Sequence, residues 1–160
     1  MKLDELLKKN FFNFLFVLFI FLLDQISKYL VIEHFNQSLN QTYVVNSFLS
    51  FNLIWNDGIA FGLLRSNNQL FYNLITILIL VILIFIIRLS LKARGLEKIS
   101  YFMILGGGLG NIFDRYYHGS VIDFIDLNYK NFHWFIFNIA DIFISIGIII
   151  LIFTEIKKND

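Results

Sequence analysis

The chain of 160 residues contains no cysteine and no proline, and charged residues make up only 16 % of it. The absence of cysteine excludes disulfides, thiolate zinc sites and cysteine nucleophiles. The 13 basic and 12 acidic residues leave a net charge of +1, which gives no electrostatic basis for binding nucleic acid. The chain also lacks the G-x-S-x-G, H-E-x-x-H and Walker patterns. Nothing therefore points to a serine hydrolase, a zinc peptidase or a nucleoside triphosphatase of those types.

Apolar surface is what the chain has in excess. Hydrophobic residues make up 58 % of it, and phenylalanine alone contributes 20. A soluble domain of this length buries only about 70 % of the surface that its unfolded chain exposes. Much of this chain must therefore face lipid, and we predict a single integral-membrane domain over residues 1–160.

Four segments have the roughly 20 mostly apolar residues that a spanning helix needs. They lie at about 11–32, 70–87, 99–117 and 134–153, and the third is the weakest because it contains GGGLGNIFDR. Most basic residues gather before the first segment, between the second and third, and after the fourth. By the positive-inside rule, both termini are cytoplasmic and segments 33–69 and 118–133 are exterior. The basic and apolar amino terminus lacks a small-residue cleavage site, so we interpret it as a retained anchor.

The first exterior segment has the pattern of a small sheet. Strand-like runs at 42–45 and 51–55 flank a possible turn at 46–47, and residues 66–68 offer helix caps for the second span. The predicted fold is therefore an all-α membrane protein with four transmembrane helices and a small extracytoplasmic sheet on the outer membrane surface.

Ionisable residues are costly inside a membrane, and here they gather in the outer halves of the predicted spans. Asp24 and Lys28 stand four residues apart on one helix face, which favours a structural ion pair over a contact with a ligand. In the third span, Gly106 and Gly110 form a small-xxx-small pattern that allows another helix to approach closely.

Polar residues follow these glycines on one face of the third span. They are Asn111, Asp114 and Arg115. Asp114 and Arg115 are compatible with a pair at the helix end, or with an Arg115 side chain that reaches a neighbouring loop.

Two further acids are able to meet at the outer membrane surface. Asp123 falls in the loop after the third span, and Asp141 lies about two turns into the fourth, with Asn138 on the same face. If they meet, the two carboxylates share a proton near neutral pH, as aspartic peptidases require. The spacing alone equally allows a capped polar cluster with a surface acid, or a membrane transporter. His118 and His133 make a metal site conceivable, but such residues are more often ordinary polar loop residues.

Four motifs, taken in order, resemble those of the prolipoprotein signal peptidases, the signal peptidase II family. The first is DQISK at 24–28, and the second is NDGIAFG at 56–62. The third is GGGLGNIFDR at 106–115 with GSVIDFID at 119–126, and the fourth is FNIAD at 137–141. Each motif is modest evidence by itself, whereas four in order around four spans make a specific match.

The resemblance implies an aspartic endopeptidase of the bacterial inner membrane, with its active site near the outer face. Such enzymes remove signal peptides from diacylglyceryl-modified prolipoproteins by cleaving before the lipidated cysteine. The implied catalytic pair is Asp123 and Asp141. The implied residues around the substrate and the pair are Asn56, Asn111, Arg115 and Asn138, with Asp24 and Lys28 in support.

The resemblance also implies a fold of four spans with an exterior β-cradle and a mobile exterior segment. Its implied partners are prolipoprotein substrates and membrane lipid, without nucleic acid, metal or organic cofactor, and we expect a monomer. We further expect the loop around Phe61 to cover the peptide. Two departures are visible: Gly108 stands where the family commonly has alanine, and Phe135 follows Trp134 where many members have proline.

Two other classes of function remain as alternatives. An ion- or solute-carrying protein would use Asp24, Asp114, Asp123 and Asp141 as a relay, but it should also place acids in the inner halves of the spans. A scaffold subunit would use the same acids only to pair helices.

Overall fold

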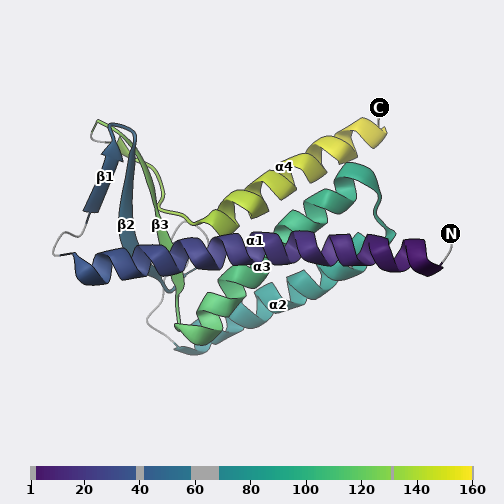
Figure 1. The fold of residues 1–160 in the computed structure, drawn as a ribbon, viewed down its shortest axis with the longest axis horizontal. Coiled ribbons are helices and arrows are strands. Elements are labelled where there is room, and N and C mark those ends of the chain that lie inside the picture. The colour runs from purple at the N-terminus through teal and green to yellow at the C-terminus, as the bar shows by residue number, and fades with distance from the viewer. Residues whose placement is uncertain (1–2, 39–41, 59–68, 131, 160) are drawn as a thin grey trace.

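The computed structural model describes residues 3–38, 42–58, 69–130 and 132–159. Within these residues there are four helices: α1 (Leu3–Gln37), α2 (Gln69–Lys92), α3 (Gly95–Tyr117) and α4 (Ile139–Asn159). The four strands are β1 (Thr42–Asn46), β2 (Leu49–Asn56), β3 (Val121–Tyr129) and β4 (Phe132–His133). The helices form a bundle with the sheet at one end, whereas the start of α1 and the end of α4 lie at the other (Figure 1).

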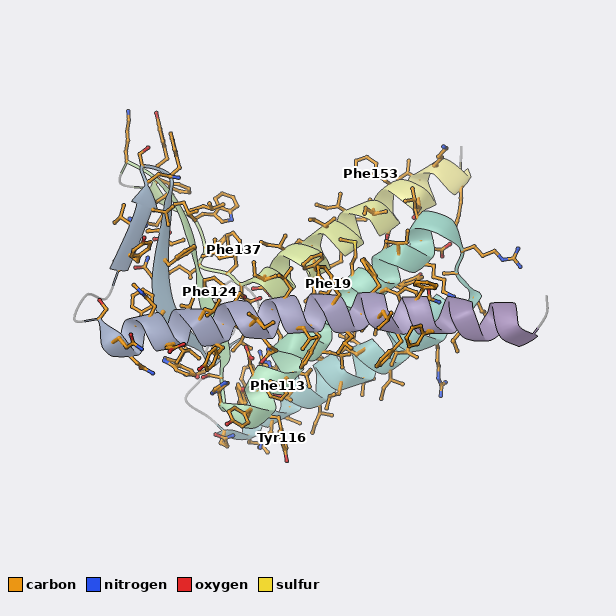
Figure 2. All side chains as sticks on the ribbon, in the orientation of Figure 1. Phe19, Phe113, Tyr116, Phe124, Phe137 and Phe153 are labelled. Atoms are coloured by element: carbon orange, nitrogen blue, oxygen red, sulfur yellow. The ribbon has the colours of Figure 1, made fainter. Side chains whose placement is uncertain are left out.

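Three of the described helices are long and apolar enough to cross a membrane: Phe11–Gln37, Gln69–Lys92 and Ile139–Lys158. Their outward side chains are large and apolar, as Phe19 and Phe153 illustrate (Figure 2). The first, second and fourth predicted segments are thus confirmed as helices of membrane-spanning length. The third predicted segment is helical too, but its glycines and charged residues make it less apolar than the other three.

Two helix ends differ from the predicted span boundaries in an informative way. The first helix continues to Gln37 instead of ending near residue 32. The fourth begins at Ile139 rather than near residue 134, because the chain before it is extended and Phe137 pairs with Ile125 of β3. That pairing joins the start of α4 to the sheet.

Helix α3 lies at the centre of the bundle and packs against the other three helices. Its consecutive glycines each admit a different neighbour: Gly106 faces α1, Gly107 faces α4 and Gly108 faces α2. A Cβ atom on Gly107 would stand only 2.5 Å from the carbonyl oxygen of Ala140. Small residues at these positions therefore allow the backbones of the bundle to approach closely.

The sheet is antiparallel throughout, in the order β1-β2-β3-β4. The predicted hairpin of β1 and β2 is confirmed, and its turn is stabilised by the Asn46 side chain, which accepts hydrogen bonds from the backbone of Phe48 and Leu49. The predicted loop around Asp123 is wrong, because these residues form β3. Residues 121–126 of β3 are buried on both faces, so they lack the alternation that marks a half-exposed strand.

The predicted helix caps at 66–68 and the loop around Phe61 lie outside the described residues.

Candidate active site

Asp123 and Asp141 are both buried and line one cavity of about 560 Å³. Asp123 comes from β3, opposite Ile54 of β2, and Asp141 comes from the first turn of α4. The prediction that Asp141 lies about two turns into the helix is wrong, because the helix starts later than its apolar run. The strand and the helix end together bring the two acids to the junction of sheet and bundle.

Asn138 links the two carboxylates directly. Its side-chain Nδ2 donates to Asp123 Oδ1 at 2.7 Å, and its backbone N–H donates to Asp141 Oδ2 at 3.3 Å. In return, Asn138 Oδ1 accepts from the backbone N–H of Asp141 at 2.9 Å. This reciprocal pattern is a capping box at the start of α4, which satisfies backbone donors that the helix leaves unpaired. The capping interaction that starts the helix therefore also holds Asp141 near Asp123.

Two more asparagines bind the pair from other elements. Asn56 at the end of β2 donates from Nδ2 to Asp123 Oδ2 at 2.8 Å. Asn111 of α3 donates from Nδ2 to Asp141 Oδ1 at 2.9 Å. Each carboxylate thus receives an amide donor from a separate element, which restricts how it can rotate.

The electrostatics of the pair favour a bound proton. Burial, and next the nearby Asp141 carboxylate, raise the pKa of Asp123 from 3.8 to about 7, although the amides of Asn56 and Asn138 oppose this shift. Two acids coupled in this way titrate as a unit and hold one proton between them near neutral pH.

A buried ion cluster supports the pair from α1 and α3. Lys28 Nζ lies 2.7 Å from Asp24 Oδ2 and 2.7 Å from Asp114 Oδ2. It also donates to Asn111 Oδ1 at 3.1 Å, and Asp24 Oδ1 accepts from the backbone N–H of Ala140 at 2.8 Å. The predicted pair of Asp24 and Lys28 is confirmed, and the cluster anchors both Asn111 and the start of α4.

Arg115 does not pair with Asp114, because Asp114 binds Lys28 instead. Its Nη2 donates to the carbonyl of Gly58, in the exterior segment that follows β2. Of the two alternatives that the sequence allowed for Arg115, contact with a neighbouring loop is therefore the one observed.

Sequence reasoning missed two groups that the structure brings to this region. Gln25 donates from Nε2 to Asp24, to the carbonyl of Gly110 and to Asp114 Oδ1, and its position inside the first motif was a signal. Tyr72 lies against Arg115, and nothing in the sequence marks it.

The two histidines considered as metal ligands contact residues other than Asp123 and Asp141. His133 Nδ1 lies 2.9 Å from Asp126 Oδ2, and His118 packs edge-on against Trp55. Across the described ranges, no group of three or more His, Asp or Glu side chains converges as a metal site would require.

Comparison with solved structures identifies the class of protein that this fold represents. Two structures of bacterial membrane enzymes, both determined by the in meso method, superpose with TM-scores of 0.74 and 0.71. They are 31 % and 32 % identical to this chain, cover 92 % and 91 % of it, and are themselves covered over 89 % and 92 %. The fold is that of a bacterial membrane enzyme.

Sequence comparison narrows the class to a family. The model of the signal peptidase II family matches residues 16–157. The lipoprotein signal peptidase of Pelagibacter ubique is 41 % identical, over 95 % of this chain and 92 % of that protein. That of Listeria monocytogenes is 34 % identical, over 92 % of this chain and 97 % of that protein. The chain belongs to the signal peptidase II family, and is thus a membrane protease of lipoprotein processing.

Proposed function

We propose that this chain is an aspartic endopeptidase that removes the signal peptides of diacylglyceryl-modified prolipoproteins. It cleaves on the amino-terminal side of the lipidated cysteine, with Asp123 and Asp141 as its catalytic pair. The observation that carries the proposal is the placement of these two buried carboxylates in one cavity, joined by Asn138. Family membership supplies the substrate class.

In the proposed reaction, the pair begins with one proton. The charged carboxylate takes a proton from a water molecule, whose oxygen attacks the scissile carbonyl carbon, while the protonated carboxyl donates to the carbonyl oxygen. Collapse of the tetrahedral intermediate breaks the C–N bond, and a proton passes to the leaving amine. The pair returns to its singly protonated state. The proposed steps use only the two acids and water, without a metal or cofactor.

The supporting residues act through orientation. Asn56, Asn111 and Asn138 hold the carboxylates by the amide donors described above. Arg115 holds the backbone of Gly58 after β2, while Asp24 and Lys28 stabilise the ends of the helices that carry the site.

We also propose that α3 crosses the membrane, which makes four spans in all. Its 23 residues correspond to about 34 Å of helix, enough for the hydrocarbon core. Of its charged residues, Asp114 and Arg115 are buried in the bundle rather than exposed to lipid, and Glu97 and Lys98 lie in its first turn. The basic residues at the ends of α2 and α4 lie opposite the sheet, so the termini are cytoplasmic and the sheet lies at the outer face of the inner membrane.

The cavity offers the precursor a path from the lipid. Its lining includes, besides the polar residues of the site, apolar residues of α2 and α4, namely Ile75, Leu78, Ile79, Ile82, Ile144 and Ile148. A diacylglyceryl precursor keeps its acyl chains in the bilayer while its scissile bond lies near the interface. We infer that the monomer receives the apolar part of the precursor between α2 and α4.

The arrangement of acids opposes an ion-carrying role. Among the described residues, all the buried acids lie where the helices meet the sheet: Asp24, Asp114, Asp123, Asp126 and Asp141. A relay would need acids at several depths along the spans.

Incubation of the purified protein with a lipidated precursor tests the proposal. We expect cleavage directly before the lipidated cysteine, and its loss in Asp123→Asn and in Asp141→Asn, both still folded. Asp126→Asn is the matched control, because Asp126 is also a buried acid of β3 but does not line the cavity. Cleavage that persists in either of the first two variants rejects the catalytic pair.

A further inference from the structure

Tyr72 lies in the first turn of α2 and is buried, although it belongs to none of the four sequence motifs. Its ring faces the guanidinium of Arg115, whose central carbon lies 4.9 Å from the ring centroid. An aromatic face attracts a cation at this distance, and more strongly where water is excluded. Tyr72 is therefore a direct neighbour of a proposed site residue.

Among the described residues, the Arg115 side chain has few other polar partners. It is buried, and in the described part of the chain no carboxylate lies within ion-pair distance of it. Two of its nitrogens, Nε and Nη1, have no hydrogen-bond partner there. A buried guanidinium with so few partners depends on those that remain. These are the Tyr72 ring and the carbonyl of Gly58.

Gly58 connects Arg115 to the catalytic pair. Its carbonyl accepts from Arg115, while its N–H donates to Asn56 Oδ1 at 2.8 Å. Because the oxygen end of the Asn56 amide is held by Gly58, its nitrogen end points to Asp123 Oδ2. A continuous series of contacts thus runs from Tyr72 of α2 to Asp123 of β3.

We propose that Tyr72 is a positioning residue for the hydrolysis: its ring holds Arg115 against Gly58 and thereby keeps the Asn56 amide turned toward Asp123. This inference rests on the proposed function, in which Asp123 is catalytic.

Loss of the Asn56 amide has a chemical consequence that a general loss of packing does not. That amide stabilises the charged form of Asp123, so without it Asp123 holds its proton to higher pH. The other charged groups facing Asp123 are Asp141 from α4, Lys28 from α1 and, through the backbone of β3, Asp114 from α3. A substitution at Tyr72 removes none of these charged groups, so their own influence on Asp123 remains.

The experiment compares Tyr72→Leu, which removes the ring, with Tyr72→Phe, which keeps it, in cleavage of a lipidated precursor. We expect Tyr72→Leu to lose roughly tenfold in kcat with much less change in KM. The alkaline limb of its kcat/KM profile should move up by roughly half a pH unit. Tyr72→Phe should match the parent, because it keeps the ring that faces the Arg115 guanidinium. Tyr116→Leu is the control, since Tyr116 is exposed on the outside of α3 (Figure 2).

Three results overturn the inference: an unchanged Tyr72→Leu, a lower kcat with an unmoved pH profile, or a Tyr72→Phe as impaired as Tyr72→Leu. If Tyr72→Leu does not fold, Tyr72→Met decides by the same measurements, because its flexible side chain fills the space without an aromatic face. Absence of cleavage by the parent protein contradicts the proposed function instead, so the two failures are distinguishable.

Discussion

Asp123 illustrates how one side chain acquires its chemistry from its surroundings. In water an aspartate is charged at neutral pH, whereas here burial and the Asp141 carboxylate raise its pKa to about 7. The amides of Asn56 and Asn138 moderate this effect by stabilising the charged form. The balance gives the pair a proton that is available near physiological pH, which is what a general acid needs.

The raised pKa of Asp123 predicts the alkaline limb of activity. Below about pH 7 Asp123 keeps its proton, and as the pH rises through this value Asp123 loses it, so the carbonyl oxygen loses its proton donor. We therefore expect kcat/KM to fall as the pH rises through about 7. Initial rates of precursor cleavage in detergent across the pH range measure this. A rate that is constant from about pH 6 to about pH 9 would contradict it.

At the start of α4, the residues that cap the helix are also residues of the candidate site. Asn138 and Asp141 form the capping box, and the Asp24 carboxylate accepts from the next free backbone donor, that of Ala140. Negative charge at a helix N-terminus is also favoured by the helix dipole. The position of Asp141 is thus determined by helix capping as much as by its cavity.

The glycines of α3 predict a sharp contrast between neighbouring substitutions. Gly107→Ala would place its Cβ against the backbone carbonyl of Ala140, which cannot move without shifting α4. We expect it to destabilise the protein by about 1–3 kcal/mol, the usual range for overpacking. Gly108→Ala meets the side chain of Leu83, whose nearest methyl group can rotate away, and should cost much less. Thermal unfolding of both variants in detergent measures the difference, and equal melting temperatures would count against this account of helix packing.

If the precursor binds in the cavity between α2 and α4, a side chain that fills this cavity should weaken its binding. Ile79 lines this cavity, whereas the adjacent Leu80 is exposed on the outside of α2. Ile79→Trp should fill part of the 560 Å³ and raise KM for a lipidated precursor, with a smaller effect on kcat. Leu80→Trp adds the same bulk toward lipid and should leave KM unchanged. Steady-state kinetics with both variants tests this, and an equal KM for the two would place the precursor elsewhere.

The sequence by itself determined the features that depend on neighbouring residues. Long apolar runs predicted α1, α2 and α4, and alternating residues predicted the hairpin of β1 and β2. The spacing of Asp24 and Lys28 predicted their ion pair, because residues four apart share a helix face. The candidate site residues all lie in the four sequence motifs, and the structure brings these motifs to one end of the bundle.

Only the tertiary structure decided the features that join distant segments. Residues 121–126 form a strand because they pair with β2, and the burial of both faces hides the periodicity that marks a half-exposed strand. The start of α4, the partner of Asp114 and the contact of Tyr72 with Arg115 likewise depend on groups far away in the chain. Hydropathy and spacing describe the chain's local preferences, whereas a buried charge is satisfied by whichever partner the fold brings within reach.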